Sequence, residues 1–123
     1  MIPGLFDATM QRLSYGLDGL SQRQQIIADN IANVDTPGYL THDIPFEQQL
    51  LDAMNDPLST SAAPTNLPDA ITRNDLQVRN DGNNVAINMQ MNEMTGTAVT
   101  YEAATQLISQ KFGMLSDALA PIN

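Results

Sequence analysis

The sequence contains no cysteine and no tryptophan, and its aromatic residues amount to three phenylalanines and three tyrosines. The absence of cysteine excludes disulfide bonds, thiolate metal ligands and cysteine nucleophiles. With so few aromatic rings, any core must be built mainly from aliphatic side chains and the seven methionines. Because 123 residues correspond to one domain, we expect a single structural unit with a thin aliphatic core.

Basic residues are also scarce, since 5 lysines and arginines face 14 acidic residues and give a net charge of -9. This balance disfavours nucleic acid and anionic membrane surfaces as partners. No apolar run approaches the roughly 20 residues that span a bilayer. The first residues lack the basic and apolar regions of a signal peptide, because no basic residue precedes Arg12. We therefore expect no nucleic-acid partner, no membrane span and no cleaved signal peptide.

Apolar residues recur every three or four positions near both ends of the chain, a spacing typical of coiled-coil helices. The N-terminal seam, in which Gln24 is the polar exception, consists of Phe6, Met10, Leu13, Leu17, Leu20, Ile27, Ile31 and Val34. The C-terminal seam consists of Met91, Met94, Ala98, Tyr101, Thr105, Ile108, Phe112, Leu115 and Leu119. These seams predict an N-terminal helix over 1–34 and a C-terminal helix over 91–123.

The region 35–90 has a different composition and carries most of the acidity. Apolar residues on one face predict a short helix near 45–54. Three prolines and no charge between Pro57 and Pro68 indicate an extended loop over about 57–71. Apolar alternation on both sides of Asp81–Gly82 predicts a β-hairpin over 76–89. The expected fold class is mainly α, with two long terminal helices forming an antiparallel coiled-coil-like pair and a β-hairpin and extended loop inserted between them.

No residue pattern in the sequence indicates catalysis or a cofactor. His42 lies beside Asp43, but a lone histidine without a second histidine or a cysteine favours a solvated loop residue over a metal site. A calcium loop around Gly82 fails on spacing, because Gln77 and Asn88 would occupy ligand positions that require acidic residues. We expect no catalytic residue, no metal, no cofactor and no enzymatic activity.

The stretch from Asn30 to Tyr39 lies where the N-terminal seam ends. Asn33 can adopt the left-handed conformation that terminates a helix, and Pro37–Gly38 fits the centre of a type II turn. A helix stop would be a sufficient explanation of this pattern. The residues expected to fix the exit of the chain from the helix are Asn30, Asn33, Thr36, Pro37, Gly38 and Tyr39.

The order of residues in this stretch is more specific than the end of a helix requires. Residues 29–39, DNIANVDTPGY, resemble the N-terminal signature of the bacterial flagellar axial proteins, which comprise the rod, hook and hook-associated families. Residues 43–50, 81–85 and 91–94 are similar to the proximal rod proteins of the basal body in particular. The resemblance covers both ends of the chain and leaves only the proline-rich loop unmatched.

The resemblance implies a structural subunit of the periplasmic rod that is exported unfolded by the flagellar type III export apparatus. It implies as partners other copies of the chain, neighbouring rod proteins, and the adaptor protein FliE at the base of the rod. Its terminal helices would pack with those of neighbours around the export channel. The residues expected to form these assembly seams are Phe6, Met10, Leu13, Leu17, Leu20, Ile27, Ile31, Val34, Tyr101, Ile108, Phe112, Leu115 and Leu119.

Three other interpretations of the sequence stay open. The seams could close on each other in a self-contained helical bundle. The chain could be a soluble helical adaptor or secretion chaperone that binds an amphipathic helix of a partner. A small cell-wall hydrolase would need paired carboxylates such as Asp43 and Glu47 in a cleft, and no pattern around them predicts one. If assembly orders the seams, the ends of the monomer are expected to be partly disordered.

Overall fold

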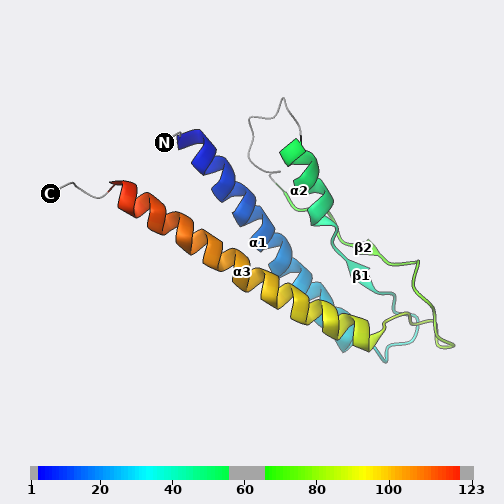
Figure 1. Ribbon diagram of the computed structural model, residues 1–123. Coiled ribbons are helices and arrows are strands. Elements are labelled where there is room, and N and C mark those ends of the chain that lie inside the picture. The colour runs from blue at the N-terminus through cyan, green and yellow to red at the C-terminus, as the bar shows by residue number, and fades with distance from the viewer. Residues whose placement is uncertain (1–2, 56–65, 120–123) are drawn as a thin grey trace.

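Long helices occupy both ends of the chain. The computed structural model describes residues 3–55 and 66–119. Along the chain, the elements are α1 (Pro3–Ala32), β1 (His42–Asp43), α2 (Phe46–Asn55), β2 (Ile71–Thr72) and α3 (Ile87–Leu119). Helices α1 and α3 pack against each other and run antiparallel, so the first turn of α1 and the last turn of α3 lie at the same end of the molecule (Figure 1). The predicted mainly α class, with two long helices and a small antiparallel strand pair between them, is confirmed.

Helix α1 begins at Pro3, whose missing N–H is not needed in a first turn. It ends differently from the expectation, because no non-glycine residue in the described ranges has a positive φ angle. Asn33 therefore does not terminate the helix in the left-handed conformation; its Nδ2 donates to the Asp29 carbonyl at 2.8 Å instead. The type II turn is confirmed, since Gly38 has a φ of 77° and the Tyr39 N–H donates to the Thr36 carbonyl at 3.3 Å.

The strand pair is not where the sequence predicted it. His42 pairs with Thr72, and Asp43 pairs with Ile71. The hairpin predicted over 76–89 is wrong, although Asp81–Gly82 does form a tight turn in which the Gly82 N–H donates to the Arg79 carbonyl at 2.9 Å.

One further backbone hydrogen bond closes this turn, from the Arg79 N–H to the Asn83 carbonyl at 2.8 Å, and the neighbouring backbone groups bond to another segment. The Asp81 carbonyl accepts from the Gly38 N–H at 2.9 Å, and the Asn84 N–H donates to the Tyr39 carbonyl at 3.3 Å. Helix α3 then begins at Ile87, four residues before the expected position, and takes up the last part of the predicted second strand. The residues that predicted a hairpin therefore form a turn that contacts the loop following α1.

Helix α2 packs on the side of α1. Its first residue, Phe46, is buried and lies against α1 at Gly19, where an added Cβ would come within 2.4 Å of the ring. The small core comprises Tyr15, Leu20, Ile26, Ile44 and Phe46, with Leu50 and Leu67 packed against it. The helix lies within one residue of the range that the sequence indicated, whereas residues 56–65 of the expected loop lie outside the described residues.

Helix α3 contributes little to this core. Its buried residues are Gln90 and Thr97, both polar and both in its first third. Among the described helices, none is long and apolar enough to cross a membrane. The core thus lies between α1, α2 and the strand pair, and the distal part of α3 stays outside it.

Candidate assembly interface

Asn30 connects three segments at the end of α1. Its side chain is fully buried, and its Nδ2 donates to the His42 carbonyl and to Gln90 Oε1, both at 2.9 Å. Its Oδ1 accepts from the His42 N–H at 3.0 Å and from the Tyr39 hydroxyl at 3.2 Å. All hydrogen-bonding positions of this amide are therefore used, and they join α1 to β1 and to the first turn of α3.

Asn83 makes an equivalent connection from the other side. Its side chain is also fully buried, and its Nδ2 donates to the carbonyls of Asn33 and Thr36, both at 2.8 Å. Its Oδ1 accepts from the Val85 N–H at 2.7 Å. These hydrogen bonds connect the segment before α3 to the loop that follows α1.

Asn84 and Arg79 complete the connection. Asn84 Oδ1 accepts from the Thr41 N–H, and its Nδ2 donates to the Arg73 carbonyl, both at 2.6 Å. Arg79 donates to the Val85 carbonyl at 2.6 Å and to the carbonyl of Val34. We call the set of Asn30, Asn83, Asn84, Arg79 and Gln90 the polar latch. Of these residues, the sequence predicted a role only for Asn30, although the resemblance of residues 81–85 to rod proteins was a signal for Asn83 and Asn84.

Two glycines beside the polar latch, Gly38 and Gly82, are required by their conformation. Gly82 has a φ of 83°, and an added Cβ would lie 3.2 Å from the Cα of Gly38, which itself has a φ of 77°. Both angles are readily available only to glycine. Thr36 supports the turn by donating from its hydroxyl to Asn33 Oδ1 at 3.1 Å, while Pro37 is exposed.

Known proteins are similar to this chain in sequence. A family model described as flagella basal body rod protein matches residues 10–39, which include the signature stretch. The flagellar basal body rod protein FlgB of Bacillus subtilis is 29% identical over 124 residues, covering 94% of this chain and 95% of that protein. FlgB of Aeromonas hydrophila is 31% identical over 124 residues, covering 93% of this chain and 94% of that protein.

The chain belongs to the FlgB family of flagellar basal body rod proteins. FlgB of Salmonella typhimurium is similar over a comparable range, with 29% identity over 127 residues that cover 89% of this chain and 92% of that protein. The family supports a structural role in the rod of the flagellar basal body.

The N-terminal seam of this FlgB family member is only partly covered in the monomer. Leu20 and Ile27 are buried. The half-buried members are Met10, Leu13, Leu17, Ile31 and Val34. The side chain of Phe6 lies outside the described part of the structure. Because α1 packs against both α2 and α3, its apolar side chains are shared between two intramolecular contacts.

The C-terminal seam divides into two lines with different exposure. Met94, Ile108 and Leu115 are half-buried, and they lie in register with the buried Gln90 and Thr97. The other members alternate with them on an exposed flank, namely Met91, Ala98, Thr105, Phe112 and Leu119. Tyr101 is also exposed. The sequence therefore identified the right helix, but its heptad spacing did not distinguish the line that faces α1 from the line that faces outward.

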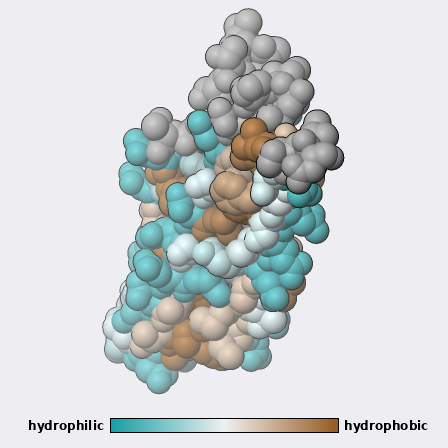
Figure 2. All heavy atoms as spheres, turned by 90° about the vertical axis from the view of Figure 1, so that its left-hand side faces the viewer, coloured by the Kyte–Doolittle hydropathy of each residue, from teal (hydrophilic) through white to brown (hydrophobic). Residues whose placement is uncertain are grey.

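Exposed apolar side chains are concentrated on α3. We call the set of Val99, Tyr101, Leu107, Phe112, Met114 and Leu119 the exposed apolar surface of α3. By helical spacing it has two parts, with Tyr101, Phe112 and Leu119 on one side of the helix and Val99, Leu107 and Met114 on the other. Phe112 is 55% exposed and Leu119 is 71% exposed. Figure 2, viewed from the end where α1 begins and α3 ends, shows hydrophobic residues gathered along the middle of the face between hydrophilic flanks. Large exposed apolar side chains in such a group are typical of an interaction surface.

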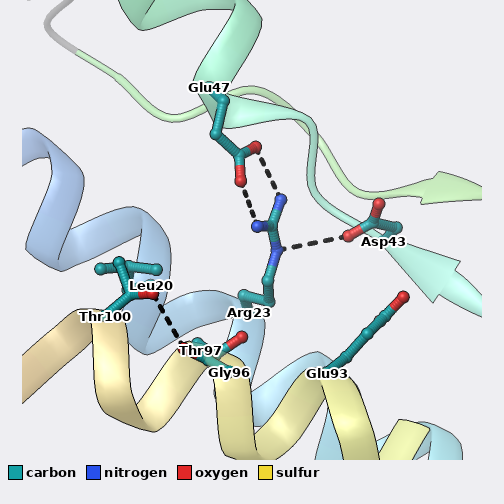
Figure 3. A pocket seen from close by; sticks show the side chains of 8 residues that line it. All are labelled: Leu20, Arg23, Asp43, Glu47, Glu93, Gly96, Thr97 and Thr100. Atoms are coloured by element: carbon teal, nitrogen blue, oxygen red, sulfur yellow. Dashed lines mark hydrogen bonds and ion pairs between the residues drawn. The ribbon is translucent and has the colours of Figure 1, made fainter. Parts of the chain in front are cut away.

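A charged groove lies between α1, β1, α2 and α3 (Figure 3). Arg23 lies at the centre of the groove, and both terminal nitrogens of its guanidinium group pair with the Glu47 carboxylate. The guanidinium also donates to the Ile44 carbonyl at 2.7 Å, and its Nε lies 3.5 Å from an Asp43 carboxylate oxygen. Burial is the largest single influence and would raise the pKa of Glu47, but the hydrogen bonds from Arg23, a backbone hydrogen bond and the charge of Arg23 together lower that pKa. Opposite Asp43, Glu93 projects from α3. Burial, followed by the negative charge of Asp43, raises the pKa of Glu93.

His42 has a structural role in this arrangement. Its backbone is bonded to Asn30, and its ring packs against Tyr39 with ring centres 5.4 Å apart. In the described ranges, no group of three histidine, cysteine or acidic side chains is placed to hold a metal ion.

Proposed function

We propose that the chain assembles through the outward faces of its two long helices into the hollow rod that serves as drive shaft and export channel of the flagellum. In this assembly its neighbours are other copies of the chain, further rod proteins and the adaptor FliE. It would reach the periplasmic rod through the flagellar type III export apparatus.

The observation that supports this proposal is the exposed apolar surface of α3. A solitary protein would leave these side chains in water, whereas burial against a neighbour contributes about 25 cal/mol per Å² of apolar area, reduced by the cost of ordering the helices. The polar latch holds α1 and α3 together at the opposite end and leaves this surface available to neighbours.

The test replaces Phe112 with aspartate and measures co-purification with intact basal bodies. Because Phe112 is 55% exposed, Phe112→Asp leaves the fold of the monomer unchanged while placing a charge in the contact. We expect at least about a tenfold loss of incorporation with normal export, because a charge buried without a partner in an interface costs several kcal/mol. Ile31→Asp on the half-buried face of α1 is expected to block assembly as well.

Gln110→Asp is the matched control, because Gln110 is an exposed polar residue on the same helix. It is expected to incorporate normally. Normal rods built from Phe112→Asp would overturn the role assigned to this surface. A wild-type chain that stays in the cytoplasm as a monomer or dimer bound to another protein would instead identify an adaptor or secretion chaperone.

A further inference from the structure

Two opposite charges on α3, Glu93 and Lys111, differ from the arginines that have acidic partners. Arg23, Arg73 and Arg79 each have an acidic partner. Lys111 is the only lysine of the sequence, and it makes no ion pair among residues 3–55 and 66–119. Glu93 is half-buried and likewise has no ion-pair partner within those ranges.

Glu93 lines the charged groove, a cavity of about 360 Å³ with Asp43 on the opposite wall (Figure 3). Thr97, which is only 6% exposed, also lines the groove. Within the described residues its hydroxyl makes no side-chain hydrogen bond, unlike those of Thr95, Thr100 and Thr105, which donate to carbonyls of their own helix.

Several polar groups that line the groove have no hydrogen-bond partner among the residues that the structure describes. Arg23 donates to Glu47 and to the Ile44 carbonyl, and its Nε, which makes no hydrogen bond there, is buried and lies 3.5 Å from Asp43, so the guanidinium offers little to a ligand. The Glu93 carboxylate and the Thr97 hydroxyl can both accept, and Asp43 adds negative charge from across the groove. This combination suits an ammonium group, which carries three donors and one positive charge. The raised pKa of Glu93 agrees with a carboxylate that lacks a cation.

We propose that the groove receives the side chain of Lys111 from a second copy of the chain, a contact that rests on the proposed assembly. Positions 93 and 111 are 18 residues apart, which is about five turns of α3 and roughly 27 Å. Both side chains therefore lie on the same side of one straight helix and never meet within one copy. A neighbour displaced along the helix axis by this distance brings its Lys111 to the level of the groove.

Two antiparallel copies would make this contact reciprocally and close as a dimer. In the proposed rod, neighbouring copies instead point the same way, so each copy offers its groove to one neighbour and its lysine to another. Contacts of this kind do not close in pairs and instead continue into rings or helical arrays. Lys111 is half-buried, and a lysine stem is long and flexible enough to lie along apolar surface while its ammonium group reaches a partner.

Cysteine cross-linking tests the contact directly, because the natural chain has no cysteine. A disulfide requires Cα atoms within about 7 Å, so a Glu93→Cys, Lys111→Cys double variant can be bridged only between copies. Oxidation of basal bodies that contain this variant is expected to give a ladder of dimers and larger species on non-reducing gels. The matched control Asn92→Cys, Gln110→Cys has the same separation on adjacent faces of α3 and is expected to give none.

Charge exchange provides a second measurement. Glu93→Lys and Lys111→Glu are each expected to lower incorporation into basal bodies about tenfold, because each places like charges in contact. The double exchange restores the opposite pair between copies and is expected to recover incorporation to within about threefold of the wild type.

The outcomes separate this inference from the proposed function. Wild-type chains that enter basal bodies, together with single exchanges that incorporate normally, would overturn the lysine contact alone. Wild-type chains that never enter basal bodies would overturn the proposed function itself.

Discussion

Among single residues, the asparagines of the signature stretch and of residues 83–84 explain why this part of the sequence is so specific. Asn30 and Asn83 bond backbone groups of segments that are distant in the chain, and both are fully buried. A buried amide that satisfies all its partners fixes one arrangement, because any other arrangement leaves polar groups without partners. The signature is therefore a set of hydrogen-bonding requirements in addition to a helix stop.

Asn30→Ala tests this role. The substitution leaves the buried groups of His42 and Gln90 without their partner, so we expect a loss of about 2–4 kcal/mol in the free energy of unfolding. Urea denaturation followed by circular dichroism measures it. The control Asn92→Ala replaces an exposed asparagine of α3 and is expected to change stability by less than about 0.5 kcal/mol. Equal stability of the two variants would contradict the assigned role of Asn30.

For the secondary-structure elements, the attachment of α2 to α1 depends on one glycine. Phe46 occupies the space that a side chain at Gly19 would need, whereas nothing lies within 4 Å of a Cβ built at Gly16. The ring of Phe46 also packs against Tyr15, with ring centres 6.5 Å apart, and under the guanidinium of Arg23 at 4.8 Å. The element is thus positioned by a close approach of ring to backbone.

The pair Gly19→Ala and Gly16→Ala provides an internal comparison, since both lie in the same helix one turn apart. Gly16→Ala is expected to stabilise the protein by up to about 1 kcal/mol through helix propensity. Gly19→Ala forces Phe46 to move and is expected to destabilise it by about 1–3 kcal/mol. Thermal unfolding measures both changes. If both variants gained stability, the contact between Phe46 and Gly19 would not be what holds α2 in place.

The pH dependence of stability also belongs to the packing of elements, because Glu93 of α3 faces Asp43 of β1. The pKa of Glu93 is raised above its ordinary value of 4.5, so the folded state binds this proton more tightly than the unfolded chain does. The resulting contribution to stability is present below pH 4.5 and is lost as the pH rises through the raised value. Arg23 and Arg73 oppose the shift without cancelling it.

We therefore expect Glu93→Gln to be more stable than the wild type at pH 7 by about 0.5 kcal/mol, a small amount because solvent screens a partly exposed group. The difference should shrink towards zero at pH 4. Urea denaturation between pH 4 and 7 measures it, with the exposed Glu102→Gln on the same helix as control. A Glu93→Gln variant that is less stable at pH 7 would mean that the carboxylate has a partner in the monomer. A Glu93 carboxylate that destabilises the monomer agrees with a role of this side chain in assembly.

In the molecule as a whole, the two ends differ in how they are held. The latch end has the buried amides and the strand pair, while the opposite end presents the exposed apolar surface of α3 (Figure 1). Local stability follows the number of buried contacts, so the open end should unfold locally at lower cost. Assembly would then order the ends of the helices.

Amide hydrogen exchange on the dilute monomer tests this difference. We expect amides of residues 8–13 and 105–119 to exchange at least about 100-fold faster than those of residues 26–32 and 87–97. Uniformly strong protection across α1, from residue 5 to its end, would refute partial disorder of the ends. It would favour the self-contained bundle instead.

The sequence by itself determined the elements that depend on local periodicity. Heptad spacing predicted both long helices, and Pro37–Gly38 predicted the turn, because these features are set by residues a few positions apart. The signature stretch also indicated the family. The scarcity of aromatic residues indicated a small core, and the core consists of a few mainly aliphatic side chains around Tyr15 and Phe46.

Only the tertiary structure decided which partners the segments take. Residues 76–89 alternate like a hairpin, but Asn83 and Asn84 find better hydrogen-bond partners about 40 to 50 residues earlier in the chain. The C-terminal seam contains two apolar lines, and periodicity cannot assign one to α1 and the other to solvent, since both satisfy a heptad repeat. The charged groove depends on four elements meeting, which no local pattern records. Long-range pairing is chosen by the free energy of the whole arrangement, and for that reason it became visible only in the fold.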